Sequence, residues 1–72
     1  MNEQIPLADQ ITCVRRELAL RKNVYPKRVA SGAMKQAEAD REMQRMEAVL
    51  NTLIDFEGLI SDFAALMRNE AS

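Results

Sequence analysis

Histidine and tryptophan are both missing from this 72-residue chain, and cysteine occurs once, as Cys13. Without histidine the chain lacks the usual general base of nucleophilic catalysis and the most common side-chain ligand of transition metals. One cysteine cannot form an internal disulfide, which is typical of a reducing compartment. We therefore expect a protein that is not an enzyme and that has no cofactor and no metal site.

Glycine is also scarce, because Gly32 and Gly58 are the only two glycines. Two isolated glycines cannot build the glycine-rich loop that cradles phosphates. Glu38 and Glu42 stand one helical turn apart and could share a divalent cation, but a solvated acidic face is the better interpretation. Cys13 lies among apolar neighbours, so we expect a buried structural thiol rather than a reactive one.

Long hydrophobic runs are absent too, since no segment reaches the length that spans a bilayer and no signal-peptide pattern is present. These absences predict a cytoplasmic protein with no membrane partner. The formal net charge of -1 conceals an asymmetry, because residues 13–35 contain seven Lys or Arg and one acid, whereas residues 36–72 contain three and eight. One half of the chain is therefore basic and the other acidic.

The length of 72 residues allows a single domain. A domain of this size buries only about 60% of its unfolded surface and is marginal as a monomer. We therefore expect a homo-oligomer, and specifically a dimer.

The clearest periodic pattern predicts a helix over about residues 36–56. Apolar side chains recur there at alternating steps of four and three, which places them in one stripe, and charged residues fill the opposite face. The stripe needs a partner on its apolar side. Its members are Ala39, Met43, Met46, Leu50 and Leu53.

A first helix is predicted over about residues 7–23, beginning directly after Pro6. Its main apolar stripe would face the second helix, and a smaller apolar set lies on another side, so this helix should touch more than one neighbour. The main stripe contains Leu7, Ile11, Val14, Leu18 and Tyr25, and the smaller set contains Cys13, Leu20 and Val24.

Pro26 follows Tyr25 and removes one backbone donor, which predicts a kink or a restart of the helix. We expect a kinked helical segment over residues 26–31, ended by Gly32 in the left-handed conformation. The short connection that follows would return the next helix antiparallel to the first, as an αα-hairpin.

Gly58 predicts an end or a bend of the long helix, and Ser61 could cap a short third helix over about residues 59–69. This tail is apolar nearly all round, so we expect it to be folded back over the hairpin or buried in a second subunit. We find no internal repeat in the sequence. The predicted fold is all-α, an antiparallel αα-hairpin with a short third helical segment, completed by homodimerisation. The candidate oligomer interface contains Phe56, Leu59, Phe63 and Leu66.

One polar constellation with some specificity surrounds the predicted hairpin tip. Glu17 and Arg21 form a favourable i,i+4 pair, and Arg21 can lie over the ring of Tyr25. These residues could simply stiffen the tip, or they could bind an anionic partner, with Tyr25 stacking on a base. The candidate partner-binding residues are Arg21, Tyr25, Lys27 and Arg28, and the wider basic cluster adds Arg15, Arg16 and Lys22.

The segment from Glu17 to Leu53 resembles a group of small uncharacterised helical proteins of phages, prophages and proteobacteria. The pattern E-x-x-x-R-x-x-V-Y-P carries the resemblance, followed by Gly32 and an Ala-Glu or Ala-Asp helix start. Lys35 departs from the pattern, because these proteins carry a Ser or Thr helix cap there. The resemblance implies a phage or prophage origin, in the cytoplasm of a bacterial host, and fixes no site residue.

Two classes of function remain. The first is a helical protein that binds and modulates an unidentified host or phage protein through its helix surfaces. The second is a nucleic-acid or nucleotide binder that uses the basic tip around Tyr25. The lack of other aromatic side chains near the basic cluster and the acidic overall balance speak against this second class.

Overall fold

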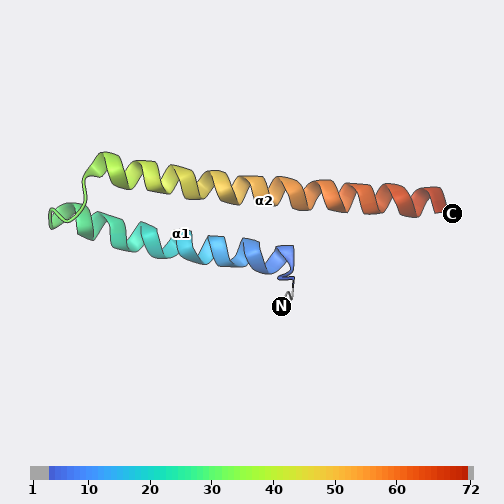
Figure 1. Ribbon diagram of the computed structural model, residues 1–72, viewed down its shortest axis with the longest axis horizontal. Helices are drawn as coiled ribbons and strands as arrows, with labels where there is room; N and C mark the ends of the chain where they lie inside the picture. Colours follow the sequence, from blue (N-terminus) through green and yellow to red (C-terminus); the bar gives the residue numbers. More distant parts are fainter. Residues whose placement is uncertain (1–3, 72) are drawn as a thin grey trace.

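The computed structural model describes residues 4–71, with side chains described through residue 69, and it shows two helices joined by a short connection (Figure 1). Helix α1 spans Leu7–Ala30 and helix α2 spans Gln36–Ala71. The helices lie side by side and antiparallel, so the all-α hairpin predicted from the sequence is confirmed. No strand occurs in residues 4–71.

The start of α1 is fixed by backbone groups. Pro6 precedes the helix with a φ of -56°, close to the value that a proline ring imposes and that suits the entrance to a helix. The Pro6 carbonyl accepts the amide N–H groups of Asp9 and Gln10 at 3.0 and 3.1 Å. The Gln10 side-chain amide donates to the carbonyl of Ile5 at 2.9 Å and so holds the segment that leads into the helix.

The end of α1 is a glycine stop. Gly32 has a φ of 83°, the one positive φ in the described part of the chain. The amide of Gly32 donates to the carbonyl of Val29 at 3.1 Å, and the amide of Ala33 donates to that of Arg28 at 2.9 Å. This Schellman arrangement satisfies two carbonyls that a helix end leaves free, and glycine enters the left-handed region without a steric penalty. The predicted stop at Gly32 is confirmed.

The predicted restart at Pro26 is not found, because α1 continues through Pro26 as one helix. Pro26 lacks the N–H that would bind the carbonyl of Lys22, but both residues are exposed. Water can satisfy a carbonyl on the exposed side of a helix. Tyr25 and Val29, on the two sides of the proline in the sequence, line a cavity between α1 and α2.

The core is a narrow seam between the two helices. Ile11 and Leu18 of α1 and Ala39 of α2 are buried, with exposed fractions of 5%, 8% and 3%. The other members of the two predicted main stripes are half-buried, as expected when each helix has one neighbour. The sequence therefore predicted the contacting sides of both helices correctly.

The smaller apolar side of α1 is mostly uncovered, although Val24 is half-buried. Cys13 is exposed, so the prediction of a buried thiol is wrong. Leu20, two turns further along the same side, is 56% exposed. A two-helix chain gives α1 a single neighbour, and this side faces away from it. The expectation that α1 touches a second neighbour is not met within the described residues.

The predicted break at Gly58 is also wrong, because α2 is one continuous helix of 36 residues. A glycine inside a helix costs only about 1 kcal/mol relative to alanine, which is too little to end a long helix. Ser61 consequently lies inside α2 and caps no separate tail helix. A Cβ at Gly58 would meet nothing within 4 Å, so no close approach requires glycine at this position.

Helix α2 extends well past the start of α1 (Figure 1). It has 36 residues and α1 has 24, and the part from residue 57 to residue 71 amounts to about 22 Å of helix at about 1.5 Å of rise per residue. We call this part, residues 57–71, the overhang. It does not fold back over the hairpin, and the molecule reaches 61 Å in its longest direction.

Candidate functional site

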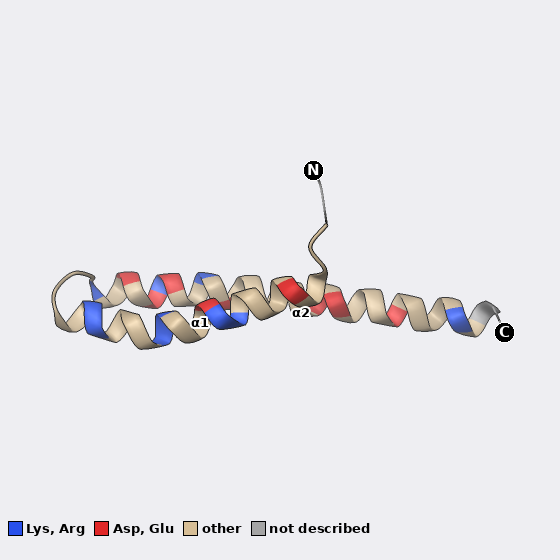
Figure 2. Ribbon diagram, turned by 90° about the horizontal axis from the view of Figure 1, so that it is seen from below, with Lys and Arg blue, Asp and Glu red and all other residues tan. Residues whose placement is uncertain are grey.

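The overhang and the turns just before it carry most of the large exposed apolar side chains. Leu59 and Phe63 are the most exposed of these, at 66% and 64%. Charged residues gather on the paired part of the hairpin and thin out along the overhang, as Figure 2 shows. We call the apolar set on α2 the exposed stripe. It consists of Val49, Phe56, Leu59, Ile60, Phe63, Leu66 and Met67.

A seven-residue spacing of apolar residues underlies the exposed stripe. Each of three consecutive heptads starts with a large apolar residue. The residues three and four positions after each start are also apolar, except for Thr52. This spacing is the pattern of helices that pair in coiled coils. The three heptads start at Val49, Phe56 and Phe63. Three positions after these starts lie Thr52, Leu59 and Leu66, and four positions after them lie Leu53, Ile60 and Met67.

Most of the exposed stripe does not face α1, although Phe56 and Ile60 at its edge share a groove with Leu7. At about 100° per residue, Phe63 and Met67 lie roughly a third of a turn from the side of α2 on which Ala39 and Leu50 contact α1. The overhang is therefore amphipathic rather than apolar nearly all round, which was the prediction. A longer α1 would therefore leave most of the stripe exposed. The side in line with α1 is polar and carries Glu57, Ser61 and Arg68.

Closer to the hairpin tip, charged residues occupy the heptad positions that apolar residues occupy in the exposed stripe. Glu42 stands one heptad before Val49, and Arg45 stands one heptad before Thr52. Nη1 of Arg45 donates to Oε2 of Glu42 at 2.9 Å. An exposed ion pair is well hydrated and gains little from burial. The exposed stripe consequently ends at Val49.

A groove of about 680 Å³ lies where the N-terminal segment meets α2. Ile5 and Leu7 form part of one wall, and Leu53, Phe56 and Ile60 form the other. Two of these residues, Phe56 and Ile60, also belong to the exposed stripe. The stripe is thus continuous with an apolar hollow at the level where α1 begins.

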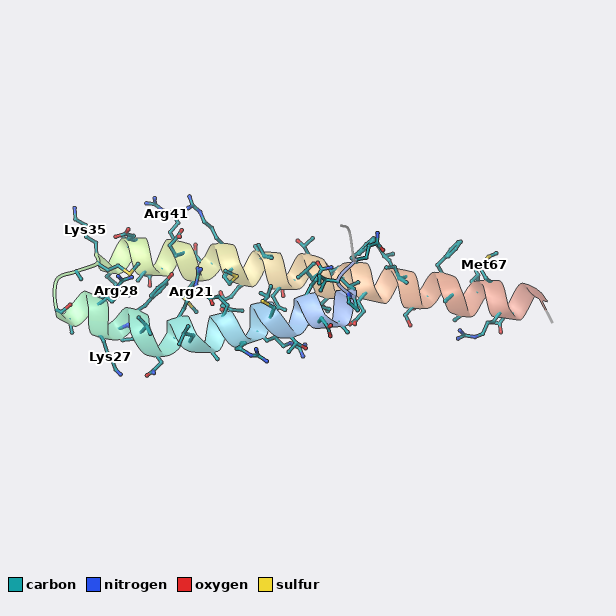
Figure 3. The ribbon with its side chains drawn as sticks, turned by 60° about the horizontal axis from the view of Figure 1, so that its bottom comes forward. Arg21, Lys27, Arg28, Lys35, Arg41 and Met67 are labelled. Carbon is teal, nitrogen blue, oxygen red and sulfur yellow. The ribbon has the colours of Figure 1, made fainter. Side chains whose placement is uncertain are left out.

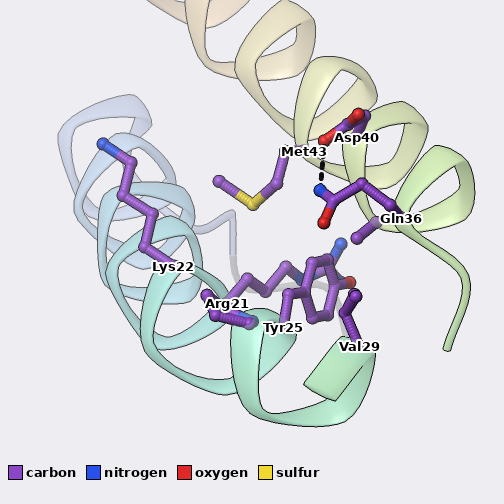
Figure 4. Close-up of a pocket in the computed structure, with 9 residues that line it drawn as sticks. Arg21, Lys22, Tyr25, Val29, Gln36, Asp40 and Met43 are labelled. Atoms are coloured by element: carbon purple, nitrogen blue, oxygen red, sulfur yellow. Dashed lines mark hydrogen bonds between the residues drawn. The ribbon is translucent and has the colours of Figure 1, made fainter. Parts of the chain in front are cut away.

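A second candidate surface is a cavity of about 240 Å³ between the helices near the tip. Arg21 and Tyr25 of α1 lie on one side of it, and Gln36 and Asp40 of α2 lie on the other (Figure 4). The side-chain amide of Gln36 donates to Oδ1 of Asp40 at 2.9 Å. The remaining lining residues are Lys22, Pro26, Val29, Ala39 and Met43.

Arg21 is held by its neighbours on α1. Its Nε donates to Oε1 of Glu17 at 2.9 Å, and its Cζ lies 5.8 Å from the centroid of the Tyr25 ring. Both contacts were predicted from the spacing and are confirmed. The hydrogen bond with Glu17 raises the pKa of Arg21, burial opposes this, and the charge of Glu42 adds to it. The Nε side of the guanidinium is therefore already engaged within the chain.

The basic residues of the tip do not form one face. Arg21 points toward α2 and Lys27 points away from it (Figure 3). Arg28 follows Arg21 by seven residues and so shares its side of the helix. Lys27 and Arg28 are both exposed. The structure therefore brings Arg21 and Tyr25 together but distributes the cations of α1 around the helix.

Residues 4–71 contain neither a candidate metal site nor a candidate membrane-spanning helix. No group of three or more histidine, cysteine or acidic side chains could hold a metal ion there, and no helix in that range is long and apolar enough to cross a membrane. Compared with protein-family models, curated proteins and solved structures, the chain matches none. The resemblance carried by residues 17–53 therefore stays a prediction.

Proposed function

We propose that the protein is a non-enzymatic helical hairpin that binds other protein chains through its helix surfaces and modulates a protein that it binds. The exposed stripe is the observation that supports this function. Its seven large apolar side chains are 47% to 66% exposed and follow a heptad repeat. Single exposed apolar side chains are normal on a protein surface, but a contiguous patch of this kind marks a site of association.

We propose further that the chain forms a homodimer with the overhang in the interface. Its buried core consists of three side chains, Ile11, Leu18 and Ala39, in the described residues. A chain this small usually needs an added source of stability, and covering the exposed stripe would supply it. The tip and the outer sides of the helices would then remain free for a host or phage protein.

Light scattering tests this assembly. The wild-type protein should have twice the 8.2 kDa mass of the chain. The double variant Phe63→Asp with Leu66→Asp should have the mass of one chain, because burying two unpaired carboxylates in the interface would be strongly unfavourable. The matched control, Ser61→Asp with Arg68→Asp, places two aspartates on the polar side of the same overhang and should remain dimeric. An unchanged mass in the first double variant would remove the overhang from the interface.

Nucleotide or nucleic-acid binding at the tip is a second candidate function. The observation that favours it is the cavity that Arg21 and Lys22 line beside Tyr25. Arg21→Glu with Arg28→Glu should then abolish binding of a short single-stranded nucleic acid while the melting temperature stays nearly unchanged. Such binding should also weaken steeply with added salt, whereas docking of apolar helices should not. Binding that survives both charge reversals would exclude the tip.

A further inference from the structure

The exposed stripe has the same spacing in both directions along α2. Phe56, Leu59, Phe63 and Leu66 are separated by steps of three, four and three residues. Because the steps read the same in both directions, the stripe can pair residue by residue with the stripe of a second copy that runs antiparallel to it. Two antiparallel copies of one helix are related by a two-fold axis. We propose that two copies of this chain pair antiparallel through their overhangs, around an axis near Ser61. The proposal rests on the proposed function, because it specifies the geometry of that same interface.

Antiparallel pairing places each phenylalanine against a leucine. With the axis at Ser61, Phe56 faces Leu66 of the second copy, and Leu59 faces Phe63 of the second copy. A larger side chain opposite a smaller one in every layer fills the interface evenly. A parallel pair in register would instead put phenylalanine against phenylalanine and leucine against leucine, which alternates crowded and loosely filled layers.

The groove beside α1 gains an occupant in this arrangement. Leu53 would lie against Met67 of the second copy, and Ile60 would lie against Ile60 of the second copy. Leu53 and Ile60 line one wall of the groove of about 680 Å³, and Leu7 lies in the other. The end of the second overhang therefore reaches the apolar hollow that the single chain leaves open.

The charged end of the stripe also favours the antiparallel direction. A parallel pair would bring Glu42 against Glu42 and Arg45 against Arg45, at the positions that precede the stripe by one heptad. An antiparallel overlap of about 20 residues around Ser61 ends before these residues and sends the two basic α1 tips to opposite ends of the dimer. The antiparallel pair creates one like-charge contact of its own, between the two copies of Asp62 near the axis. Asp62 is exposed, so water and salt screen this contact.

The stripe is large enough for a stable dimer. Six of its seven side chains lie within the overlap and are each about half exposed or more, and at on the order of 100 Å² apiece they offer about 600 Å², to which the half-buried Leu53 adds. A standard protein interface buries about 800 Å² on each partner, whereas the largest apolar patch on a typical monomer is about 300–600 Å². The available area thus fits a second copy of this chain.

Small-angle X-ray scattering, combined with light scattering on the same sample, tests the direction of pairing. The single chain is 61 Å long. An antiparallel overlap of about 30 Å predicts a dimer about 90 Å long, whereas a parallel dimer would be about 65 Å long. The mass of two chains with the longer dimension supports the proposal. The mass of two chains with the shorter dimension overturns the antiparallel geometry and leaves the homodimer standing, and the mass of one chain overturns both. A mass above two chains overturns the two-fold pairing.

A substitution at the axis gives an independent readout. Asp62→Asn should tighten the dimer by about twofold at low salt, because it removes the like-charge contact that only the antiparallel pair contains. The matched control is Asp55→Asn, one heptad earlier on the same flank, where the antiparallel pair places Asn69 of the second copy opposite. It should leave the dissociation constant unchanged. Equal effects of the two variants would contradict the position of the axis.

Discussion

The two parts of α2 have the same helical period but face different directions. Residues 36–56 turn their apolar side toward α1 and carry charged residues, such as Glu42 and Arg45, on the outside. The overhang is polar in line with α1, where Ser61 and Arg68 lie, and apolar about a third of a turn away. One helix therefore has two apolar sides. The first side is covered by α1, and the second is exposed in the described residues.

The largest effect should come from the seam that pairs the first part of α2 with α1. Leu18→Ala removes a buried side chain and should lower the free energy of unfolding by about 2–4 kcal/mol. Leu20→Ala makes the same change at an exposed position two residues away and should lower it by less than about 1 kcal/mol. Urea unfolding at one fixed protein concentration measures both. Equal losses from the two variants would mean that the seam is not the core.

The two glycines offer the same substitution with opposite signs. Gly58→Ala adds a Cβ that meets nothing within 4 Å in a helix interior and should stabilise the chain by about 1 kcal/mol. Gly32→Ala forces an L side chain into a φ of 83° and should destabilise it by about 1–2 kcal/mol. Thermal unfolding followed by circular dichroism gives both values. A destabilising Gly58→Ala would show that the overhang bends at this residue.

The smallest effect should come from the ion pair near the tip. Glu17→Gln keeps an oxygen that can accept from Arg21 but removes the negative charge of the ion pair, and it should cost about 0.3–0.5 kcal/mol, with most of the difference lost at high salt. The raised pKa of Arg21 stabilises the folded state at all pH values below its unfolded pKa, and this contribution is lost only as the pH rises through the folded value. Because an arginine titrates far above neutrality, a pH titration between about 6 and 9 should reveal no stability change from this group.

The sequence predicted the seam because periodicity depends only on which residues share a side of a helix. The predictions from sequence failed where a residue with a low helix propensity lies within a longer helix. Pro26 and Gly58 each disfavour a helix by only about 1–3 kcal/mol, and the turns on both sides of each residue outweigh that. Burial of Cys13 could not be predicted, since it depends on how many neighbours α1 has. The heptad repeat was present but hidden, because Thr52 interrupts its apolar positions.

The same comparison explains why the candidate site was only partly predictable. Phe56, Leu59, Phe63 and Leu66 were identified because large apolar residues dominate the tail of the sequence. Their common side, and its angle to the seam, became clear only when α2 proved to be a single helix. A break at Gly58 would have allowed the tail any orientation. Helix continuity therefore converts a list of apolar residues into a surface with a direction.

The length of the overhang couples helix formation to protein concentration. Residues 57–71 continue a helix that the hairpin has already nucleated, but a stretch of about 15 residues for which helix α1 supplies little packing is marginally helical in water. Pairing with another chain would shift that balance toward the ordered state by mass action. Amide hydrogen exchange should consequently slow along the last turns of α2 as the protein is concentrated, while the amides of the seam keep a protection set by the hairpin itself. The C-terminal turns would then act as a sensor of how much of this protein is present.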